Sequence, residues 1–250
     1  MKKVACMFFS VVLCLSFVGS ALAYDSPSNE DCLISIETIS INGIRTEVKT
    51  YFDEGFTVKT YRFIDPDVSK DMMESAIASI EAADTVTASA DLPLSITTTP
   101  VATHTKKFST SARAPSNIRC EASQSGTFCK SNQDYAYLWV TGGKSNAGYT
   151  DPDYTPDSIW ITETFTTTGL SLSISWPPSV SLDSTTYQKT LGPYHNVNFV
   201  TSNWPQVSAR KTAGTGFSMT VQTEVDAYLS GDHQTYGALT SYTQNFQIGW

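Results

Sequence analysis

The sequence predicts a mainly β protein, in which a C-terminal antiparallel β-sandwich follows a small α+β unit made of a three-stranded meander and one helix. Three observations predict this fold. Apolar residues alternate with Ser, Thr or Asp along the C-terminal half, Gly, Pro, Asn and Asp divide that half into short runs, and one helical repeat lies near the N-terminus. Alternation with a period of two indicates strands with one buried and one solvated face.

The meander is predicted from three runs of β-branched and aromatic residues near the N-terminus. Asn42-Gly43 and Asp53-Glu54-Gly55 separate these runs, and such pairs and triplets favour tight hairpin turns. The three runs are Leu33 to Ile41, Ile44 to Phe52 and Phe56 to Ile64.

One helix is expected to follow the meander. Asp65 and Pro66 would supply an N-cap and a first-turn proline. Apolar residues then recur at helical spacing, at Val68, Met72, Ala76, Ile80 and Ala83. We expect the helix to cover one face of the meander, so that residues 24–84 form the N-terminal unit.

Residues 85–117 are rich in Thr, Ser, Ala and Pro without sustained periodicity, which predicts a linker or an extended arm. Lys106, Lys107 and Arg113 lie within it, and extended basic residues are sites of extracellular proteolysis. The main interpretation is an uncut linker, and the alternative is release of residues 24 to about 115 as a propeptide.

Residues 118–250 are predicted to form the sandwich. Tyr135 to Val140 is apolar on both faces, as in a central strand, and Gly- and Pro-containing turns separate six or seven short strands. The alternating apolar positions are Ile159, Ile161 and Phe165; Leu170, Leu172, Ile174, Trp176, Val180 and Leu182; Phe217, Met219, Val221, Val225 and Ala227; and Tyr242, Phe246, Ile248 and Trp250.

Residues 1–23 have the features of a secretory signal peptide. Two lysines precede an apolar run from Val4 to Gly19, and Ala21-Leu22-Ala23 is a small-x-small cleavage site before Tyr24. The run is short for a membrane span. We therefore expect a secreted, extracellular protein of bacterial type that begins near Tyr24.

The charge of the chain limits the kinds of partner that it is expected to bind. The net charge is −8, only 16% of residues are charged, and no cluster of Lys and Arg could follow a phosphate backbone. Nucleic acid is therefore not an expected partner, and an acidic chain is not attracted to an anionic membrane.

Three cysteines remain after removal of the signal peptide. Cys120 and Cys129 flank a short Gly- and Ser-containing stretch, so an oxidising compartment predicts a disulfide between them across a hairpin. Cys32 is then expected to be a buried thiol, with an intermolecular disulfide or a reactive nucleophile as alternatives.

Familiar catalytic and metal-binding motifs are absent from the sequence, and no cofactor is predicted. A weak calcium candidate is the loop that carries Asp151, Asp153 and Asp157, because calcium prefers several hard oxygen ligands. Its spacing is not that of an EF-hand, so ordinary turn chemistry is the simpler interpretation.

Carboxylates give the enzymatic alternative, a glycoside hydrolase. Glu163 and Glu224 both lie in predicted strands, and retaining glycosidases use two acids about 5 Å apart. Glu224 shares the wet face of its strand with Gln222 and Asp226, so solvated surface positions are the simpler expectation for both glutamates.

Aromatic residues give the leading interpretation, a non-catalytic binding protein of the cell envelope or extracellular space. Trp160 has the opposite parity to its apolar neighbours, and Trp204 lies in a Pro-bounded loop, so with Tyr194 and His195 they could bind a glycan or an extracellular protein. A third interpretation is a pore-forming or membrane-active protein, because Ser/Thr-rich alternation such as that of Ile161 to Trp176 suits a membrane-spanning hairpin.

Overall fold

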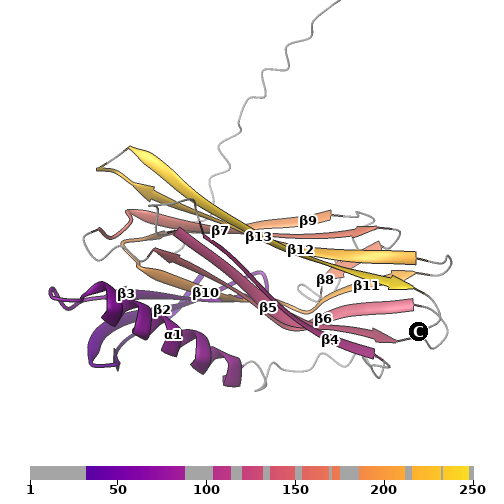
Figure 1. Ribbon diagram of the computed structural model, residues 1–250, viewed down its shortest axis with the longest axis horizontal. Helices are drawn as coiled ribbons and strands as arrows, with labels where there is room; N and C mark the ends of the chain where they lie inside the picture. Colours follow the sequence, from indigo (N-terminus) through magenta and orange to yellow (C-terminus); the bar gives the residue numbers. More distant parts are fainter. Residues whose placement is uncertain are drawn as a thin grey trace, which may run out of the picture.

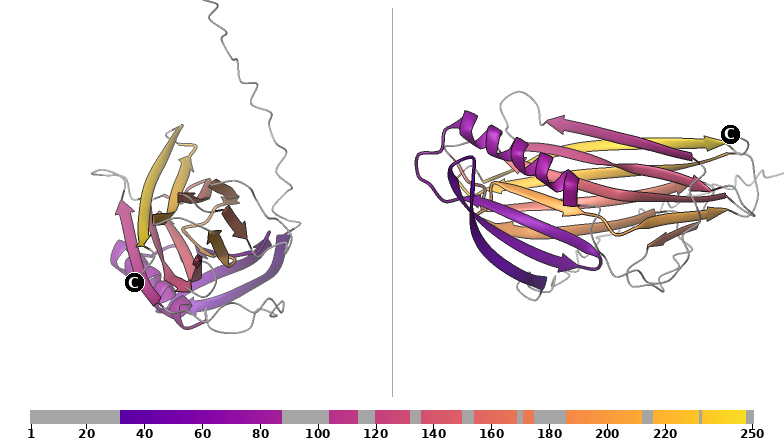
Figure 2. Two further views of the ribbon diagram at one scale, coloured as in Figure 1. Left: turned by 90° about the vertical axis from the view of Figure 1, so that its right-hand side faces the viewer. Right: turned by 90° about the horizontal axis from the view of Figure 1, so that it is seen from below.

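The computed structural model describes residues 32–87, 104–113, 120–131, 136–149, 154–168, 171–174, 186–211, 216–231 and 233–247. These residues form an elongated stack of two antiparallel sheets, with one helix on the outside (Figures 1 and 2). The mainly β fold with a small helical part is therefore confirmed. The expected signal peptide, residues 1–23, lies outside the described residues.

The predicted meander is present. Its strands are β1 (Leu33–Ile41), β2 (Ile44–Asp53) and β3 (Phe56–Phe63). Both turns use the left-handed conformation that their sequences favour, since φ is 50° at Asn42 and 46° at Glu54, and each of these residues precedes a glycine of positive φ.

Sheet A contains the meander and branches around one long strand, β6 (Ala136–Tyr149). Two strands pair with one edge of β6 at successive positions, β10 (Phe199–Asn203) and β11 (Val207–Lys211). Beyond β10 lies β3, and beyond β11 lies the short strand β8 (Ser171–Ile174). The other edge of β6 pairs with β5 (Cys120–Ser131), which pairs with β4 (His104–Arg113).

Sheet B has four strands in the order β13-β12-β7-β9. Their bounds are Ser158–Thr168 for β7, Thr186–His195 for β9, Gly216–Leu229 for β12 and Gln234–Gln247 for β13. β12 and β13 are each 14 residues long and pair along their whole length, whereas a typical strand has roughly 5 to 6 residues.

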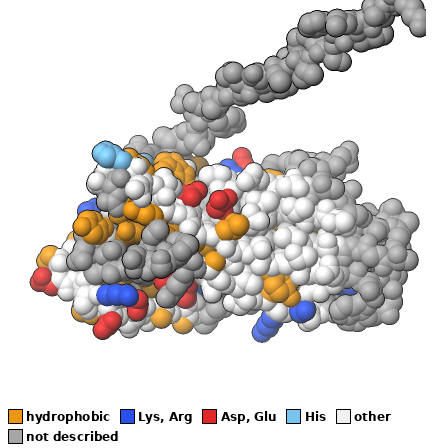
Figure 3. Space-filling model, turned by 45° about the horizontal axis from the view of Figure 1, so that its top comes forward, with side chains coloured by type: hydrophobic (Ala, Val, Ile, Leu, Met, Phe, Trp, Pro, Cys, Tyr) orange, Lys and Arg blue, Asp and Glu red, His pale blue; other side chains and the backbone are white. Residues whose placement is uncertain are grey.

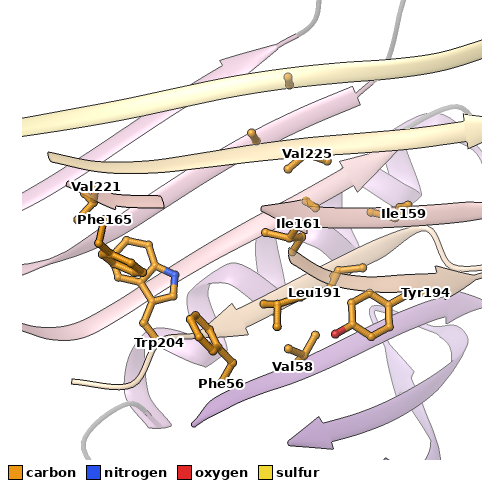
Figure 4. Packing of buried hydrophobic residues seen from close by; sticks show 14 of the residues in the cluster. Phe56, Val58, Ile159, Ile161, Phe165, Leu191, Tyr194, Trp204, Val221 and Val225 are labelled. Atoms are coloured by element: carbon orange, nitrogen blue, oxygen red, sulfur yellow. The ribbon is translucent and has the colours of Figure 1, made fainter. Parts of the chain in front are cut away.

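The core lies between the two sheets. Alternate residues of β7 and β12 point inward as the sequence predicts, among them Ile159, Ile161 and Val225, all with 0% exposure. Figure 4 shows these residues, with Leu191 of the neighbouring strand β9, facing Phe56 and Val58 of the meander strand β3.

Helix α1 (Lys70–Thr87) packs on the outer face of the meander, as expected. Its buried residues are Met73, Ala76, Ile77 and Ile80, whereas Met72 is 42% exposed, so the predicted apolar face was wrong at that position. The predicted cap was also wrong. Ser69 Oγ accepts the Met72 backbone N–H at 3.4 Å, while the Asp65 carboxylate accepts two N–H groups from Arg45 instead.

The segment expected to be a linker contains regular structure. Residues 85–87 continue α1, and His104–Arg113 form strand β4 at the edge of sheet A. The meander is part of the same sheet as the long strands, because Tyr61 of β3 pairs with Phe199 of β10. No helix among the described residues is long and apolar enough to cross a membrane.

Candidate functional site

A buried polar cluster joins the two sheets, and we call it the inter-sheet cluster. It consists of Glu163 on β7, Thr223 on β12, Ser145 on β6, Gln124 on β5 and Trp204. Glu163 and Thr223 have 0% exposure. The Ser145 hydroxyl contacts one carboxyl oxygen of Glu163 and accepts the Trp204 indole N–H at 3.1 Å.

The hydrogen-bond count indicates that Glu163 is neutral in this cluster. Thr223 Oγ1 lies 2.8 Å from Glu163 Oε2 and 3.1 Å from Gln124 Oε1, yet a hydroxyl has only one proton to donate. Both contacts are hydrogen bonds if Glu163 is protonated and donates to Thr223, which then donates to Gln124. Gln124 Nε2 in turn donates to the Val221 carbonyl at 3.1 Å.

The electrostatics agree with this assignment. Burial raises the pKa of Glu163 to about 7, although Ser145, Thr223 and Trp204 would stabilise the ionised form as donors and so oppose the shift. Among the described residues, none of the side chains that contact the carboxyl group is charged. Glu163 is fully buried and both of its carboxyl oxygens have partners, so the carboxyl group is a closed, satisfied part of the core.

The expected pairing of two catalytic glutamates does not form. Glu163 points into the core, whereas Glu224 is on the exposed face of β12 and pairs in register with Thr162, whose side chain points away from the core. The two carboxylates thus lie on opposite faces of sheet B and cannot flank one glycosidic bond. The surface position expected for Glu163 was also wrong.

Two of the four aromatic and histidine positions expected at a binding surface are interior. Trp204 is 7% exposed and packs edge-on against Phe165, with ring centroids 5.2 Å apart (Figure 4). It lies directly over Gly143, where any Cβ would come within 2.1 Å of its ring. Tyr194 is 3% exposed and packs against Tyr51. The expected exposure of these two rings was therefore wrong.

The other two positions reach the surface. Trp160 is half-buried on the outer face of β7, and His195 is exposed at the end of β9, with Nδ1 3.1 Å from the Asp157 carbonyl oxygen. In Figure 3, most of the described surface on the side of sheet B is neither hydrophobic nor charged. A binding role for Trp160 and His195 stays a prediction.

The calcium candidate lies partly outside the described residues, since these do not include Asp151 and Asp153. Asp157 accepts hydrogen bonds from the Ser230 backbone N–H at 2.5 Å and the Ser230 hydroxyl at 2.9 Å. These bonds hold the pKa of Asp157 below its usual value. No group of three or more metal-binding side chains converges within the described part of the chain.

The predicted disulfide is wrong. Cys120 and Cys129 both lie on β5, where they pair in register with Tyr149 and Trp139 of β6, respectively. The Cα atoms of Cys120 and Cys129 are nine residue steps apart along an extended strand, a distance of about 30 Å, whereas a disulfide requires less than about 7 Å. Burial raises the pKa of the Cys120 thiol to about 12, so this thiol is also unreactive.

The connection between β7 and β9, at one edge of sheet B, does not stay in that sheet. β7 and β9 pair as neighbours up to Thr166 opposite Thr186, but the chain between them leaves sheet B, because β8 pairs with β11 in sheet A. β8 has only four residues and ends the strand order of sheet A. The described part of the chain that joins β7 to β9 thus pairs with sheet A over the four residues of β8.

No family model matches the chain, and no curated protein matches it. Among solved structures, a chain described as "Pore forming protein" is similar, with 10% sequence identity and a TM-score of 0.20, over 56% of this chain and 89% of that chain. A likeness this weak carries no argument about fold or function, so the proposals below rest on the geometry and the sequence.

Proposed function

We propose that this chain is a secreted pore-forming protein, in which residues 168–184 become a membrane-spanning β-hairpin. The observation that carries the proposal is the register of β7 and β9. Thr166 lies opposite Thr186, and if this register continued, Leu170 would face Leu182 and Leu172 would face Val180. The serines between them would share the other face.

The continued hairpin would be unsuited to water. In β7 the odd-numbered residues, such as Ile161 and Phe165, point into the core. After Gly169 the apolar residues are even-numbered, so the extension would turn its apolar face away from the core. Each exposed Leu, Ile or Val would forgo about 1.5 to 3 kcal/mol of burial. A bilayer would supply that burial, whereas in water the chain instead joins sheet A through β8.

Charge suits a bilayer, and length does so when the ends of β7 and β9 are included. In the continued register Trp176 lies at the turn, so residues 168–174 and 178–184 give each arm seven positions. Two or more positions from each flanking strand complete the about 9 to 11 that a tilted transmembrane strand needs. Between Gly169 and Thr185 the only charged side chain is that of Asp183. Because one hairpin leaves its backbone edges unpaired in lipid, several copies would have to assemble side by side to line a pore.

The two other functions have less support. The hydrolase requires two neighbouring carboxylates, and Glu163 and Glu224 lie on opposite faces. The binding surface expected from aromatic residues loses Trp204 and Tyr194 to the core. The pore proposal rests on the alternation of apolar and polar residues over 170–182, and this alternation is independent of both observations.

The test is release of a trapped dye from vesicles without glycolipid, made of phosphatidylcholine alone, with phosphatidylserine, or with sterol. We expect the chain from Tyr24 onward to release dye from at least one composition. Leu172→Gln should lower the rate at least about tenfold because it places an amide on the lipid face. Ser173→Gln, the same new residue one position on, should leave the rate within about twofold because its face lines the pore.

A cysteine pair sharpens the test. Ser173 and Ser208 face each other across β8 and β11, so cysteines there should lock β8 to sheet A when oxidised and stop dye release until a reductant is added. The control pair, at Thr220 and Thr243, joins strands β12 and β13, which stay together, and should not block release. Absence of release from every vesicle type, or equal loss in both glutamine variants, would contradict the proposal.

A further inference from the structure

A hollow of about 570 Å³ opens on the outer face of sheet A, beside the C-terminal half of α1. Its floor consists of outward-facing residues of β4, β5 and β6, and many of these are small, which leaves room beside the helix. Its volume falls in the range of roughly 300 to 1,000 Å³ that small-molecule sites occupy. Ser111, Ser123, Lys144, Asn146, Glu81 and Phe199 are among its lining residues.

Hydrogen bonds to Glu81 of α1 and to Ser123 of β5 hold the polar groups of the hollow in place. Asn146 Nδ2 donates to Glu81 Oε1 at 3.1 Å and to Ser123 Oγ at 2.9 Å. The Lys144 ammonium group donates to the Glu81 backbone carbonyl at 2.9 Å. Both Lys144 and Asn146 are only 6% exposed, so their positions are fixed by packing as well as by hydrogen bonds.

These buried groups are incompletely satisfied. Asn146 Oδ1 has no hydrogen-bond partner among the described residues. Lys144 has three N–H donors, and the described residues offer an acceptor to one of them. A buried unpaired acceptor beside unused donors is costly, and a ligand that offers both kinds of group would remove that cost.

The chemistry of the lining selects the ligand class. A ligand hydroxyl, like water, can both donate to an acceptor such as Asn146 Oδ1 and accept from Lys144, and the serines around the hollow can bond to further hydroxyls. Glu81 offsets the charge of Lys144, so an anionic ligand is disfavoured. Phe199 supplies an apolar wall.

We propose that this hollow binds a neutral saccharide, either free or as the headgroup of a glycolipid. The site is separate from the aromatic positions expected from the sequence, and it does not depend on pore formation. Its ligand would sit between α1 and β4, on the face of sheet A that points away from sheet B.

The test measures binding of the chain to immobilised neutral and sialylated oligosaccharides, and to vesicles with and without a neutral glycosphingolipid. We expect neutral oligosaccharides to bind and sialylated ones to bind more weakly. Binding to the array and to glycolipid vesicles would mean that the free saccharide suffices, whereas binding to the vesicles alone would assign the lipid-linked headgroup.

Variants locate the site. Ser111 is exposed on β4, so Ser111→Tyr should fill the hollow with little effect on folding and lower saccharide binding at least about tenfold. Thr105→Tyr, an exposed position on the same strand outside the hollow, should change it less than about twofold. Thermal unfolding of both variants checks that they fold. No binding to any neutral saccharide, preference for sialylated ones, or unchanged binding by Ser111→Tyr would overturn the proposal.

Discussion

Strand β6 carries polar residues on both of its faces, and the two faces differ in how those residues are satisfied. On the inner face, Ser145 belongs to the inter-sheet cluster, in which each polar group has a partner when Glu163 is neutral. On the outer face, Asn146 lines the hollow, and its Oδ1 has no partner among the described residues. An unpaired oxygen alone does not mark a site, because Ser202 Oγ, opposite Ser145 in the closed core, has no partner among the described residues either. The comparison teaches that an unpaired buried group indicates a ligand site where it adjoins a hollow, as Asn146 does.

The largest loss of stability should come from removing Trp204, the aromatic member of the inter-sheet cluster. Trp204→Ala deletes a ring packed against Phe165 and leaves Ser145 without its indole donor. We expect a loss of about 3 to 5 kcal/mol in the free energy of unfolding, measured with urea. Trp160→Ala, at a half-buried position on the outside of sheet B, should cost clearly less. Similar losses would mean that Trp204 is not part of the core.

The next effect is a pH dependence of stability. Glu163 has an ordinary pKa of 4.5 when unfolded and about 7 when folded, so the folded state binds its proton more tightly. The contribution to stability is therefore fully present below pH 4.5 and is lost as the pH rises to about 7. At about 1.4 kcal/mol per pH unit, the loss is about 3 kcal/mol.

Glu163→Gln removes this titration and keeps the shape of the side chain. The variant should gain up to about 3 kcal/mol over the wild type at pH 8 and be close to it near pH 4.5, in urea unfolding at each pH. Glu224→Gln, the same substitution on the exposed face of sheet B, serves as the matched control. A wild-type profile that is flat between pH 4.5 and 7 would refute the neutral carboxyl group.

The smallest losses of stability should come from removing single hydroxyl groups, one in the inter-sheet cluster and one in the hollow. Thr223→Val removes the hydroxyl that links Glu163 to Gln124 and strands both partners in the core, which should cost about 1 to 3 kcal/mol. Ser123→Ala removes a half-exposed hydroxyl from the hollow, and water can replace it, so the cost should stay below about 0.5 kcal/mol. Equal costs would remove the distinction between a closed cluster and an open hollow.

The sequence predicts the local parts of this fold well. Turn residues such as Asn42 and Gly43 determine the meander through their own backbone preferences, and alternation identifies the inward faces of β7 and β12. The same alternation could have placed Glu163 inside, because it shares the parity of Ile161 and Phe165. A carboxylate is ordinarily solvated, which argued against that placement. The polar partners that make the burial of Glu163 tolerable come from other strands.

Features that depend on distant contacts could not be predicted. Trp204 stands in a loop without periodicity, and its burial requires the bare backbone of Gly143 on another strand. The separation of Cys120 from Cys129 follows from an uninterrupted strand through a stretch whose glycine and serines favour a turn. The hollow forms where Glu81 of α1 meets β5 and β6, so residues such as Ser123 and Asn146 carry no sign of it in the sequence.

The pairing of β3 with β10 has a consequence for the order in which the chain matures. Tyr61 reaches its partner Phe199 only after most of the polypeptide has been made, so sheet A cannot close during the early part of synthesis. Contacts of such long range slow folding, because loop closure must precede the stabilising contacts. The meander with its helix would therefore wait with an unpaired strand edge, and a folding helper that covers such an edge would shorten this vulnerable interval.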